Sequence, residues 1–396
     1  MSIYDTIVVG GGPGGGAAAY FLGEAGKRVL VLEKETLPRY KACGGGLSLN
    51  LLKQFPFSFE PVIESHVQSI SYALGKQEVT FPLPERSMAM VMRDQFDAHL
   101  LAHTQAEVRQ GTAVRKVIEV GDRVVVETRA GETFEGRTLV AADGANSVVA
   151  HSLGLRRGKT LVAAIEAEVP VPDPVMRQFV DAPMFIFGEA RLGYLWIFPK
   201  AAHLSVGIAA LHPKPGELQV TLERVMARYG ISLEGVPLRG HPIPIFIRRE
   251  PITTARSLLV GDAAGLVDPF SGEGIRFAIK SGRLAAEAIL SGQVKRYPNN
   301  VFREIGLNHF FAYGLAQIFY RHPRACFALG VRNPFATQAF VELLGDKVRY
   351  PEVIVRLFGS LPIFFAAEGV AALAGLLPGS ERANRSRRPK SQSEVK

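Results

Sequence analysis

Residues Tyr4–Lys34 read YDTIVVGGGPGGGAAAYFLGEAGKRVLVLEK, and this stretch decides the fold of the N-terminal part of the chain. The β-branched run Tyr4–Val9 predicts a strand, and Ala17–Ala25 has the composition of a helix. Arg28–Glu33 predicts a second strand. The order strand, glycine run, helix, strand is that of a βαβ unit with a parallel sheet.

Three glycines of the run, Gly10, Gly12 and Gly15, have the spacing G-x-G-x-x-G. The first permits a tight turn, the second lets a pyrophosphate approach the backbone, and the third lets helix and strand pack closely. The N-terminus of the helix offers amide donors to phosphate. Glu33, at the end of the second strand, is placed to bind a ribose hydroxyl. These features together predict a dinucleotide site.

The composition is that of a globular protein, with 396 residues, 47% hydrophobic and 21% charged. Such a chain suffices for one large domain or two joined domains. The motif starts a few residues after Met1, so we expect no signal or transit peptide. Cys43 and Cys326 lie far apart and predict neither a disulfide nor a metal site. A reducing, cytoplasmic setting is expected.

Part of the formal charge of +9 lies at the C-terminus. Residues Glu381–Lys396 contain six basic and two acidic side chains, a net charge of six minus two, or +4. This Ser/Arg/Asn-rich tail has the composition of a disordered segment. It is either a solubilising tail or a segment attracted to an anionic membrane surface. No interleaved aromatic-basic pattern indicates nucleic-acid binding.

A second glycine run, Gly44–Gly46, follows Cys43 directly. Three consecutive glycines cost backbone entropy and are useful where the backbone passes close to a flat ligand. The Cys43 thiol would then lie at the edge of that ligand. The alternative is a buried structural cysteine beside a flexible loop.

Two Asp-containing turns follow buried strands. Asp143-Gly144 comes after Leu139–Ala142, and Asp262 comes after Arg256–Val260. Ligands of open α/β sheets bind at the carboxyl ends of such strands. Both carboxylates are therefore candidate ligand contacts.

A glycine-rich loop leads into a predicted helix at Ile275–Ser291. Amides near Gly272, Gly274 and Ile275 would face a ring or phosphates there. Arg93, at the start of an earlier amphipathic helix, either reaches a cofactor phosphate or ribose or is a surface residue.

Between Leu161 and Ile247 the pattern changes to antiparallel strands. Tyr194, Trp196 and Phe198 share one strand face by the period of two. The next strand, Leu204–Ala209, carries only small residues on one face. This arrangement either leaves room for a long apolar ligand or packs against the other domain.

Beyond Tyr297 the chain is helical and rich in Phe. The apolar stretch Leu361–Leu377 is at the lower limit for crossing a bilayer and is interrupted by Glu368. We interpret it as a core or interfacial helix.

These motifs resemble the FAD-dependent reductases and hydroxylases of the para-hydroxybenzoate hydroxylase type. The resemblance implies that the N-terminal glycines and Glu33 hold the ADP half of FAD, and that Asp143-Gly144 lies near the pyrophosphate. It places Asp262 on the ribityl chain and Arg93 near the flavin. The predicted cofactor-binding residues are Gly10, Gly12, Pro13, Gly15, Glu33, Lys34, Arg93, Asp143, Gly144, Asp262, Gly272, Gly274 and Ile275.

Two motifs narrow the resemblance to the geranylgeranyl reductase family, which saturates prenyl double bonds of isoprenoid diphosphates, archaeal ether lipids or the chlorophyll side chain. They read Pro38-x-x-Lys41-x-Cys43-Gly44-Gly45-Gly46 and Tyr194-x-Trp196-x-Phe198-Pro199-Lys200. The glycine pair expected after the second motif is here Gly207-Ile208-Ala209, so the substrate stays open. The resemblance implies catalytic residues at Cys43, Gly44 and Gly45, and substrate contacts at Tyr194, Trp196, Phe198 and Lys200.

The expected fold is α/β (α+β), with a Rossmann-type FAD-binding domain, an inserted antiparallel-sheet substrate domain and a C-terminal helical region. The predicted domains are residues 1–66, 91–160 and 252–295 for FAD, 67–90 and 161–251 for substrate, 296–379 for the helical region, and 380–396 for a disordered tail.

The predicted reaction is hydride transfer from reduced flavin to an alkene, with Cys43 as proton donor or ring-face gate. NADPH or reduced ferredoxin is the expected electron donor, because only one dinucleotide motif is present. Lys41 and Lys200 would bind a diphosphate or solvate the cavity mouth. The alternatives are an aromatic monooxygenase, a halogenase (whose paired tryptophans are absent here) and a non-redox prenyl escort protein. Contact with a membrane through the C-terminal region is left open.

Overall fold

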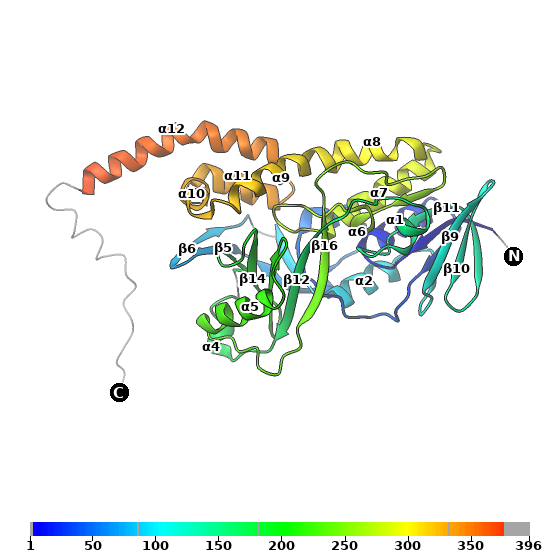
Figure 1. Ribbon diagram of the computed structural model, residues 1–396, viewed down its shortest axis with the longest axis horizontal. Coiled ribbons are helices and arrows are strands. Elements are labelled where there is room, and N and C mark those ends of the chain that lie inside the picture. The colour runs from blue at the N-terminus through cyan, green and yellow to red at the C-terminus, as the bar shows by residue number, and fades with distance from the viewer. Residues whose placement is uncertain (1–2, 85–86, 181, 332, 376–396) are drawn as a thin grey trace.

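The computed structural model describes residues 3–84, 87–180, 182–331 and 333–375 (Figure 1). The predicted disordered tail, Glu381–Lys396, and the end of the apolar stretch Leu361–Leu377 lie outside these residues. The strands are β1 Tyr4–Val9, β2 Val29–Leu32, β3 Gly46–Ser48, β4 Ile63–Val67, β5 Ser69–Leu74, β6 Gln77–Pro82, β7 Met88–Val91, β8 Glu107–Arg109, β9 Val114–Val120, β10 Arg123–Thr128, β11 Thr133–Ala141, β12 Thr160–Val169, β13 Met184–Phe187, β14 Gly193–Pro199, β15 Leu204–Ala210, β16 Arg239–Ile245 and β17 Ser257–Leu259. The α-helices are α1 Pro13–Glu24, α2 Arg93–Ala102, α3 Val148–Ser152, α4 Asp173–Met176, α5 Glu217–Arg228, α6 Gly261–Ala264, α7 Ile275–Leu290, α8 Tyr297–Val301, α9 Leu307–Phe319, α10 Pro323–Cys326, α11 Pro334–Leu344 and α12 Tyr350–Gly375.

The first sheet contains the predicted βαβ unit. Its order is β8-β2-β1-β11-β10-β9, with β17 also paired to β11. Strands β8, β2, β1, β11 and β17 run parallel, while β10 and β9 form an antiparallel extension. The predicted Rossmann-type architecture is therefore confirmed. The carboxyl ends of β1, β11 and β17 meet at one edge of the sheet, and this edge positions the candidate site.

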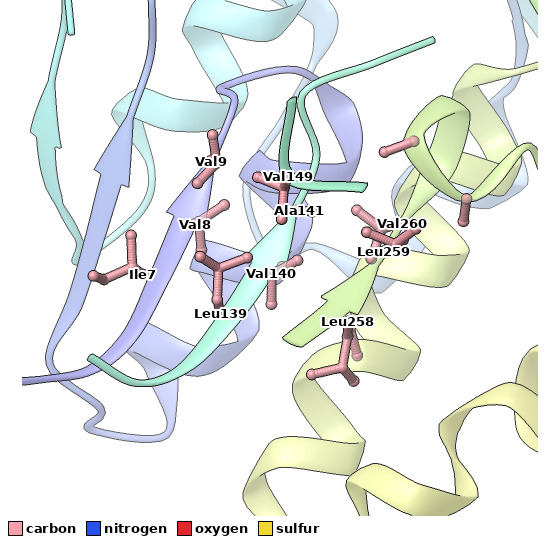
Figure 2. Close-up of a cluster of buried hydrophobic side chains, with 14 of the residues drawn as sticks. Ile7, Val8, Val9, Leu139, Val140, Ala141, Val149, Leu258, Leu259 and Val260 are labelled. Atoms are coloured by element: carbon pink, nitrogen blue, oxygen red, sulfur yellow. The ribbon is translucent and has the colours of Figure 1, made fainter. Parts of the chain in front are cut away.

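The core of this sheet consists of short aliphatic side chains from its central strands. Figure 2 shows Ile7, Val8 and Val9 of β1 beside Leu139–Ala141 of β11 and Leu258–Val260 at β17. Most of these side chains are wholly buried. Continuous apolar runs are typical of parallel strands that are covered on both faces, which explains why the sequence pattern identified all three strands.

Helix α1 begins at Pro13, four residues before the predicted start, and thus includes Gly14–Gly16. Proline favours the first turn of a helix because its fixed φ suits that position and it needs no amide partner there. The glycines are required by close packing. A Cβ on Gly15 would lie 1.9 Å from the Gly10 carbonyl oxygen, and one on Gly14 would lie 3.2 Å from the Ala278 carbonyl oxygen of α7.

Strand β11 is one continuous strand that begins six residues before the predicted segment Leu139–Ala142. Its first half pairs antiparallel with β10 and its second half pairs parallel with β1. Gly136 takes part in both pairings and interrupts the apolar pattern, so the apolar run Leu139–Ala142 marks only the second half of the strand. A Cβ on Gly136 would lie 3.0 Å from the Ile7 side chain, which explains the glycine.

The second large sheet is the expected antiparallel unit, with order β16-β12-β15-β14-β13-β5-β6. Strands β13 and β5 pair in parallel, and the other neighbours pair antiparallel. Helix α5 packs against β12 and β15 of this sheet. A third sheet, β3-β7-β4, was not predicted, because its strands are only three to five residues long.

The C-terminal helices lie together along one side of the molecule (Figure 1). Helix α9 packs against α12, and α12 also packs against α11. Within the described residues, the structure contains no helix long and apolar enough to cross a bilayer.

His309 docks α9 onto the first domain. Its ring is wholly buried, lies 4.2 Å from the Phe277 ring of α7 between centroids, and its Nε2 is 3.0 Å from the Leu266 carbonyl oxygen. Burial lowers the pKa of His309 from 6.5 to about 4. The neutral ring is therefore part of the folded state.

Replacing His309 with Gln is expected to flatten the acid dependence of stability. Below the ordinary histidine pKa the unfolded chain binds a proton that the folded chain does not, so stability is lost as pH falls from 6.5 toward about 4. The loss in unfolding free energy between neutral pH and about pH 4.5 should be smaller by about 2 kcal/mol in the variant. Urea unfolding at both pH values measures it. His322→Gln, at an exposed histidine, is the control; an unchanged dependence in His309→Gln would contradict the prediction.

Candidate active site

A single cavity of about 1150 Å³ extends from the carboxyl edge of the first sheet to the aromatic face of the second. Its volume exceeds the roughly 300–1000 Å³ of a typical pocket for one small ligand. Of the site residues predicted from the sequence, all but Gly15 and Lys200 line it. The cavity therefore has room for a dinucleotide together with a second ligand.

At one end of the cavity, the glycine motif surrounds the N-terminus of α1. Gly10 has φ +99, and a Cβ there would lie 2.4 Å from the Ala142 carbonyl oxygen. Gly12 behaves differently, because the nearest atom to a Cβ placed on it is Arg93 Nη2, 3.7 Å away. Gly10 is thus required by the turn, whereas Gly12 keeps space open. No side chain caps the helix, so its first amides are available to an anion.

Glu33 lies buried at the end of β2. Its Oε2 accepts a hydrogen bond from the Gly11 amide at 2.6 Å, and its Oε1 accepts one from the Glu35 amide at 3.0 Å. The two amides fix the carboxylate at the cavity wall, where the sequence predicted a ribose contact. The adjacent Lys34 also lines the cavity but is largely exposed, and its Nζ lies 3.7 Å from Glu35 Oε1.

Arg93 belongs to a buried cluster of charged side chains with Arg39 and Asp97. Of these three residues, the sequence predicted only Arg93 as a site residue. Its Nε and Nη2 donate to the Asp97 carboxylate at 2.9 and 2.8 Å, and Arg39 Nη2 donates to the same carboxylate at 2.9 Å. Burial opposes the charge of Arg93, but Asp97 outweighs it and raises the pKa of the guanidinium. Arg39 Nε also lies 4.0 Å from Glu33 Oε1, so two guanidiniums and two carboxylates meet beside the glycine motif.

Two buried polar atoms at this end have no hydrogen-bond partner within the described part of the chain. Arg39 Nη1 is a donor without an acceptor, and Asp143 Oδ1 is an acceptor without a donor. The other oxygen, Asp143 Oδ2, accepts from the Val149 amide at 3.1 Å, and burial raises the pKa of this carboxyl. A ligand bound in the cavity can supply the missing partners of such buried polar groups. Together with the open space at Gly12, they fit the phosphates and hydroxyls of FAD.

Asp262 lies beside His241, which in turn contacts Lys41 from another distant part of the chain. His241 Nε2 of β16 lies 3.9 Å from Asp262 Oδ2, and Lys41 Nζ lies 2.6 Å from the same His241 nitrogen. Burial opposes the charge of Asp262, but His241, Lys41 and Arg93 outweigh it and lower the pKa of the carboxyl. Burial and Arg93 lower the pKa of Lys41 to about 8. His241 was missed because no motif in the sequence marks it.

The Gly44–Gly46 loop presses against the aromatic strand β14. A Cβ on Gly44 would lie 2.8 Å from the Phe198 ring, and one on Gly45, whose φ is +71, would lie 1.9 Å from the Val91 carbonyl oxygen. The glycines thus serve close packing, as well as lining the cavity. Cys43, just before them, is partly exposed in the cavity and lies beside the Arg93 guanidinium.

Tyr194, Trp196 and Phe198 lie on one face of β14, as predicted, and line the far end of the cavity. The space above the small residues of β15 is partly filled by Trp196, because a Cβ on Gly207 would lie 2.2 Å from its ring. The Tyr194 hydroxyl donates to the Ser271 carbonyl oxygen at 2.5 Å, and Trp196 Nε1 is buried with no partner among the described residues.

The loop before α7 completes this end of the wall. Gly272 has φ +72, and a Cβ on it would lie 2.7 Å from the Tyr194 hydroxyl oxygen. Gly274 precedes the first turn of α7 and Ile275 begins it, with no side-chain cap. Burial raises the pKa of the neighbouring Glu273 to about 7, although Arg276 Nη2 lies 2.7 Å from its carboxylate. Leu344 of α11 also lines the cavity, a contact that the C-terminal sequence did not indicate.

Lys200 differs from the expectation that it contacts a diphosphate or the cavity mouth. It is almost wholly buried, and its Nζ donates to the carbonyl oxygens of Gly44 and Val91 at 2.7 and 3.0 Å. Burial lowers the pKa of its ammonium group. Lys200 follows Phe198 by two residues and lies behind the Gly44–Gly46 loop. It therefore supports the loop from outside the cavity.

Replacing Lys200 with Met is expected to destabilise the protein by about 2 kcal/mol, because two buried carbonyl groups lose their donor. The loosened loop should also expose Cys43, so that iodoacetamide alkylates its thiol faster. Urea unfolding and the alkylation rate measure the two effects. Lys214→Met, at an exposed lysine, is the control, and equal stability and alkylation in Lys200→Met would show that the loop does not depend on Lys200.

Comparison with known proteins agrees with this geometry. Residues 3–229 match the family described as "FAD binding domain". A chloroplastic geranylgeranyl diphosphate reductase of Oryza sativa is 30% identical over 376 residues, which cover 86% of this chain and 78% of that protein. A menaquinone reductase of Mycolicibacterium smegmatis is 28% identical over 320 residues, covering 74% and 78%. A crystal structure of a geranylgeranyl bacteriochlorophyll reductase-like protein from Thermoplasma acidophilum superposes with a TM-score of 0.77 at 25% identity, covering 91% and 99%.

Proposed function

Because this chain belongs to the geranylgeranyl reductase family of FAD-binding oxidoreductases, we propose that it reduces carbon–carbon double bonds of a prenyl chain. The proposed substrate is an isoprenoid diphosphate, a prenylated lipid or the side chain of a chlorophyll precursor. NADPH or reduced ferredoxin is the proposed electron donor. The proposed location is the cytoplasm, with or without peripheral contact at a membrane.

One observation supports the proposal above others, namely the continuity of the cavity. The dinucleotide end, with Gly12 and Glu33, and the aromatic end, with Trp196, belong to one space. The Cys43–Gly45 segment lies between the two ends and forms part of the wall. A cofactor held at one end can therefore meet an apolar chain held at the other.

The residues at the dinucleotide end divide the binding of FAD among them. We propose that the α1 amides and Arg39 hold the phosphates, that Glu33 holds the ribose, and that Asp262 holds a ribityl hydroxyl. Bound and reduced, FAD supplies the hydride for the reaction. Lys41 and His241 hold the Asp262 carboxylate in place from the side of β16.

The residues at the aromatic end act on the substrate. An isolated prenyl alkene is not polarised, so the site must contribute orientation and exclusion of water. We propose that Tyr194, Trp196 and Phe198 provide the apolar wall that does both. Cys43 Sγ would donate the proton to the second alkene carbon, and Gly44 and Gly45 allow the backbone to lie close to that position.

An anaerobic experiment on the purified protein tests this function. The visible spectrum is recorded, dithionite is added until the flavin is reduced, and geranylgeranyl diphosphate is then added. We expect the flavin to be reoxidised without oxygen, and the saturated product to be found by mass spectrometry. A panel with a prenylated quinone and a geranylgeranyl lipid identifies the head group.

Two outcomes would contradict the proposal. A flavin that every prenyl compound leaves reduced, but that oxygen reoxidises with hydroxylation of an aromatic substrate, would indicate the monooxygenase alternative. A colourless protein that cannot be loaded with FAD would exclude flavin chemistry and leave the escort protein.

A further inference from the structure

The C-terminal helices expose a large apolar surface. Sixteen large hydrophobic residues are exposed among the described residues, and nine of them lie between Leu307 and Phe365. Every phenylalanine among the sixteen belongs to these nine. Single exposed hydrophobic residues are ordinary on a protein surface, but a concentration of this kind marks an interaction site. The nine residues are Leu307, Phe310, Phe311, Ile318, Phe335, Val355, Phe358, Ile363 and Phe365.

On α9 the exposed residues form one stripe. Leu307, Phe310, Phe311 and Ile318 follow the three- and four-residue spacing of a helix face, while His309 and Ala312 on the opposite face are buried. The helix contains no Asp, Glu, Lys or Arg from Leu307 to Phe319. This side of α9 therefore offers a partner only apolar contacts.

Helix α12 continues the surface on the same side of the molecule. Val355, Phe358, Ile363 and Phe365 are 56 to 70% exposed, whereas Val353 is buried. The helix packs against α9 and α11, so the two helices that carry the exposed residues belong to one layer (Figure 1). We define the apolar face as these four residues together with the α9 stripe.

Basic side chains lie at the borders of the apolar face. Arg303, just before α9, is 71% exposed, and Arg321, just after it, is also exposed. Arg356 of α12 is partly exposed beside Glu342. The sequence that follows α12 adds the net charge of +4 of Glu381–Lys396. An apolar face bordered by arginines is the pattern of helices that lie in the interface of a membrane containing anionic lipid.

The apolar face and the cavity are connected through α9. Phe319, at the end of the helix, packs edge-on against Phe187 of β13 with ring centroids 4.9 Å apart. The next residue, Tyr320, stacks on Tyr194, which lines the cavity, at 6.5 Å. The helix that carries the exposed stripe thus also supports the aromatic end of the site.

We propose that the apolar face of α9 and α12 binds the protein to the surface of an anionic lipid bilayer, with the bordering arginines on the headgroups. The face lies in the bilayer interface and does not cross the membrane. This inference rests on the proposed function in one respect, since a bilayer is where a prenyl lipid substrate would be met. The surface itself is argued from exposure and charge.

Vesicle flotation of the full-length, FAD-loaded protein tests the proposal. The vesicles contain phosphatidylcholine alone or with about one third phosphatidylglycerol. We expect the wild-type protein to float with the anionic vesicles, to bind the zwitterionic ones more weakly, and to be partly released by high salt. Two double variants remove the stripes, Phe310→Ser with Ile318→Ser, and Phe358→Ser with Ile363→Ser. Each should lower the fraction bound about tenfold.

A matched control uses exposed residues away from the apolar face. Val120 and Val220 are 54 and 65% exposed, and Val120→Ser with Val220→Ser should leave flotation unchanged. The visible flavin spectrum and the thermal midpoint show that each variant is folded.

Three results would overturn the proposal. In the first the wild-type protein floats with neither kind of vesicle, and in the second a variant with all four serines floats like wild type. In the third result the wild-type protein is a dimer that does not bind vesicles and that the four serines convert to a monomer. The last would assign the face to self-association. Flotation without reduction of any prenyl compound would refute the proposed function and leave the surface standing, whereas reduction without flotation would refute the surface alone.

Discussion

Gly12→Val is expected to abolish the retention of FAD while leaving the fold intact. Gly12 has an ordinary extended conformation, with φ −76, so a side chain causes no backbone strain. The nearest atom to a Cβ there is 3.7 Å away, so the isopropyl group enters open cavity beside the first amides of α1. The second glycine of this motif exists to let a pyrophosphate approach. We expect the FAD dissociation constant to rise at least about 100-fold, a loss of about 3 kcal/mol.

The experiment compares Gly12→Val with Gly15→Val by flavin titration and thermal unfolding. A Cβ on Gly15 would lie 1.9 Å from the Gly10 carbonyl oxygen, so this second variant should lose stability as well as FAD. Gly314→Ala, at a helical glycine with no atom within 4 Å of the added methyl, should affect neither. A Gly12→Val protein that binds FAD like wild type would show that the diphosphate lies elsewhere.

Cys43→Ala is expected to lower the rate of alkene reduction by about 10² to 10⁴, the usual contribution of one positioned general acid. The substitution removes the proton at Sγ but keeps the glycine loop, whose position depends on Lys200 and Val91. Retention of FAD and its reduction by dithionite should therefore be unchanged. Single-turnover reoxidation of the reduced flavin by geranylgeranyl diphosphate measures the effect.

The other cysteine is the natural control. Cys326 lies in the C-terminal region, outside the wall of the cavity, and burial raises the pKa of its thiol. Cys326→Ala should reoxidise the flavin at the wild-type rate. If Cys43→Ala does the same, the proton comes from water or another group. Cys43→Ser keeps a weaker proton donor at the same position. Its rate of flavin reoxidation should lie between the rates of Cys43→Ala and the wild-type protein.

The local parts of the site were predictable because each has its own sequence signal. The glycine motif and Glu33 lie within one βαβ unit of about thirty residues, and such units form the same geometry wherever they occur. Asp143 and Asp262 follow buried strands, and the parallel pairing of β1, β11 and β17 brings their ends together. Tyr194, Trp196 and Phe198 alternate along one strand, so the period of two alone predicted that they share a face.

The parts that were missed depend on contacts between distant segments. Arg39 and Arg93 meet at Asp97, and Lys41 meets His241 from a strand two hundred residues away. A single Arg, Asp or His in a sequence is compatible with many roles. Its role is decided by the residues that surround it in the folded protein. Lys200 illustrates the opposite error, because a motif placed it at the substrate whereas the fold turns it behind the loop.

By itself the sequence determined the class of this protein, since the motifs for FAD and for prenyl reduction are local patterns whose geometry is set within a few residues. The tertiary structure decided how these patterns combine. It joins the dinucleotide edge and the aromatic face into one cavity, links Asp262 to Lys41 through His241, and packs α9 and α12, which carry the exposed residues, against each other on one side of the molecule. Such features arise from packing between elements far apart in the chain, and no single stretch of sequence contains them.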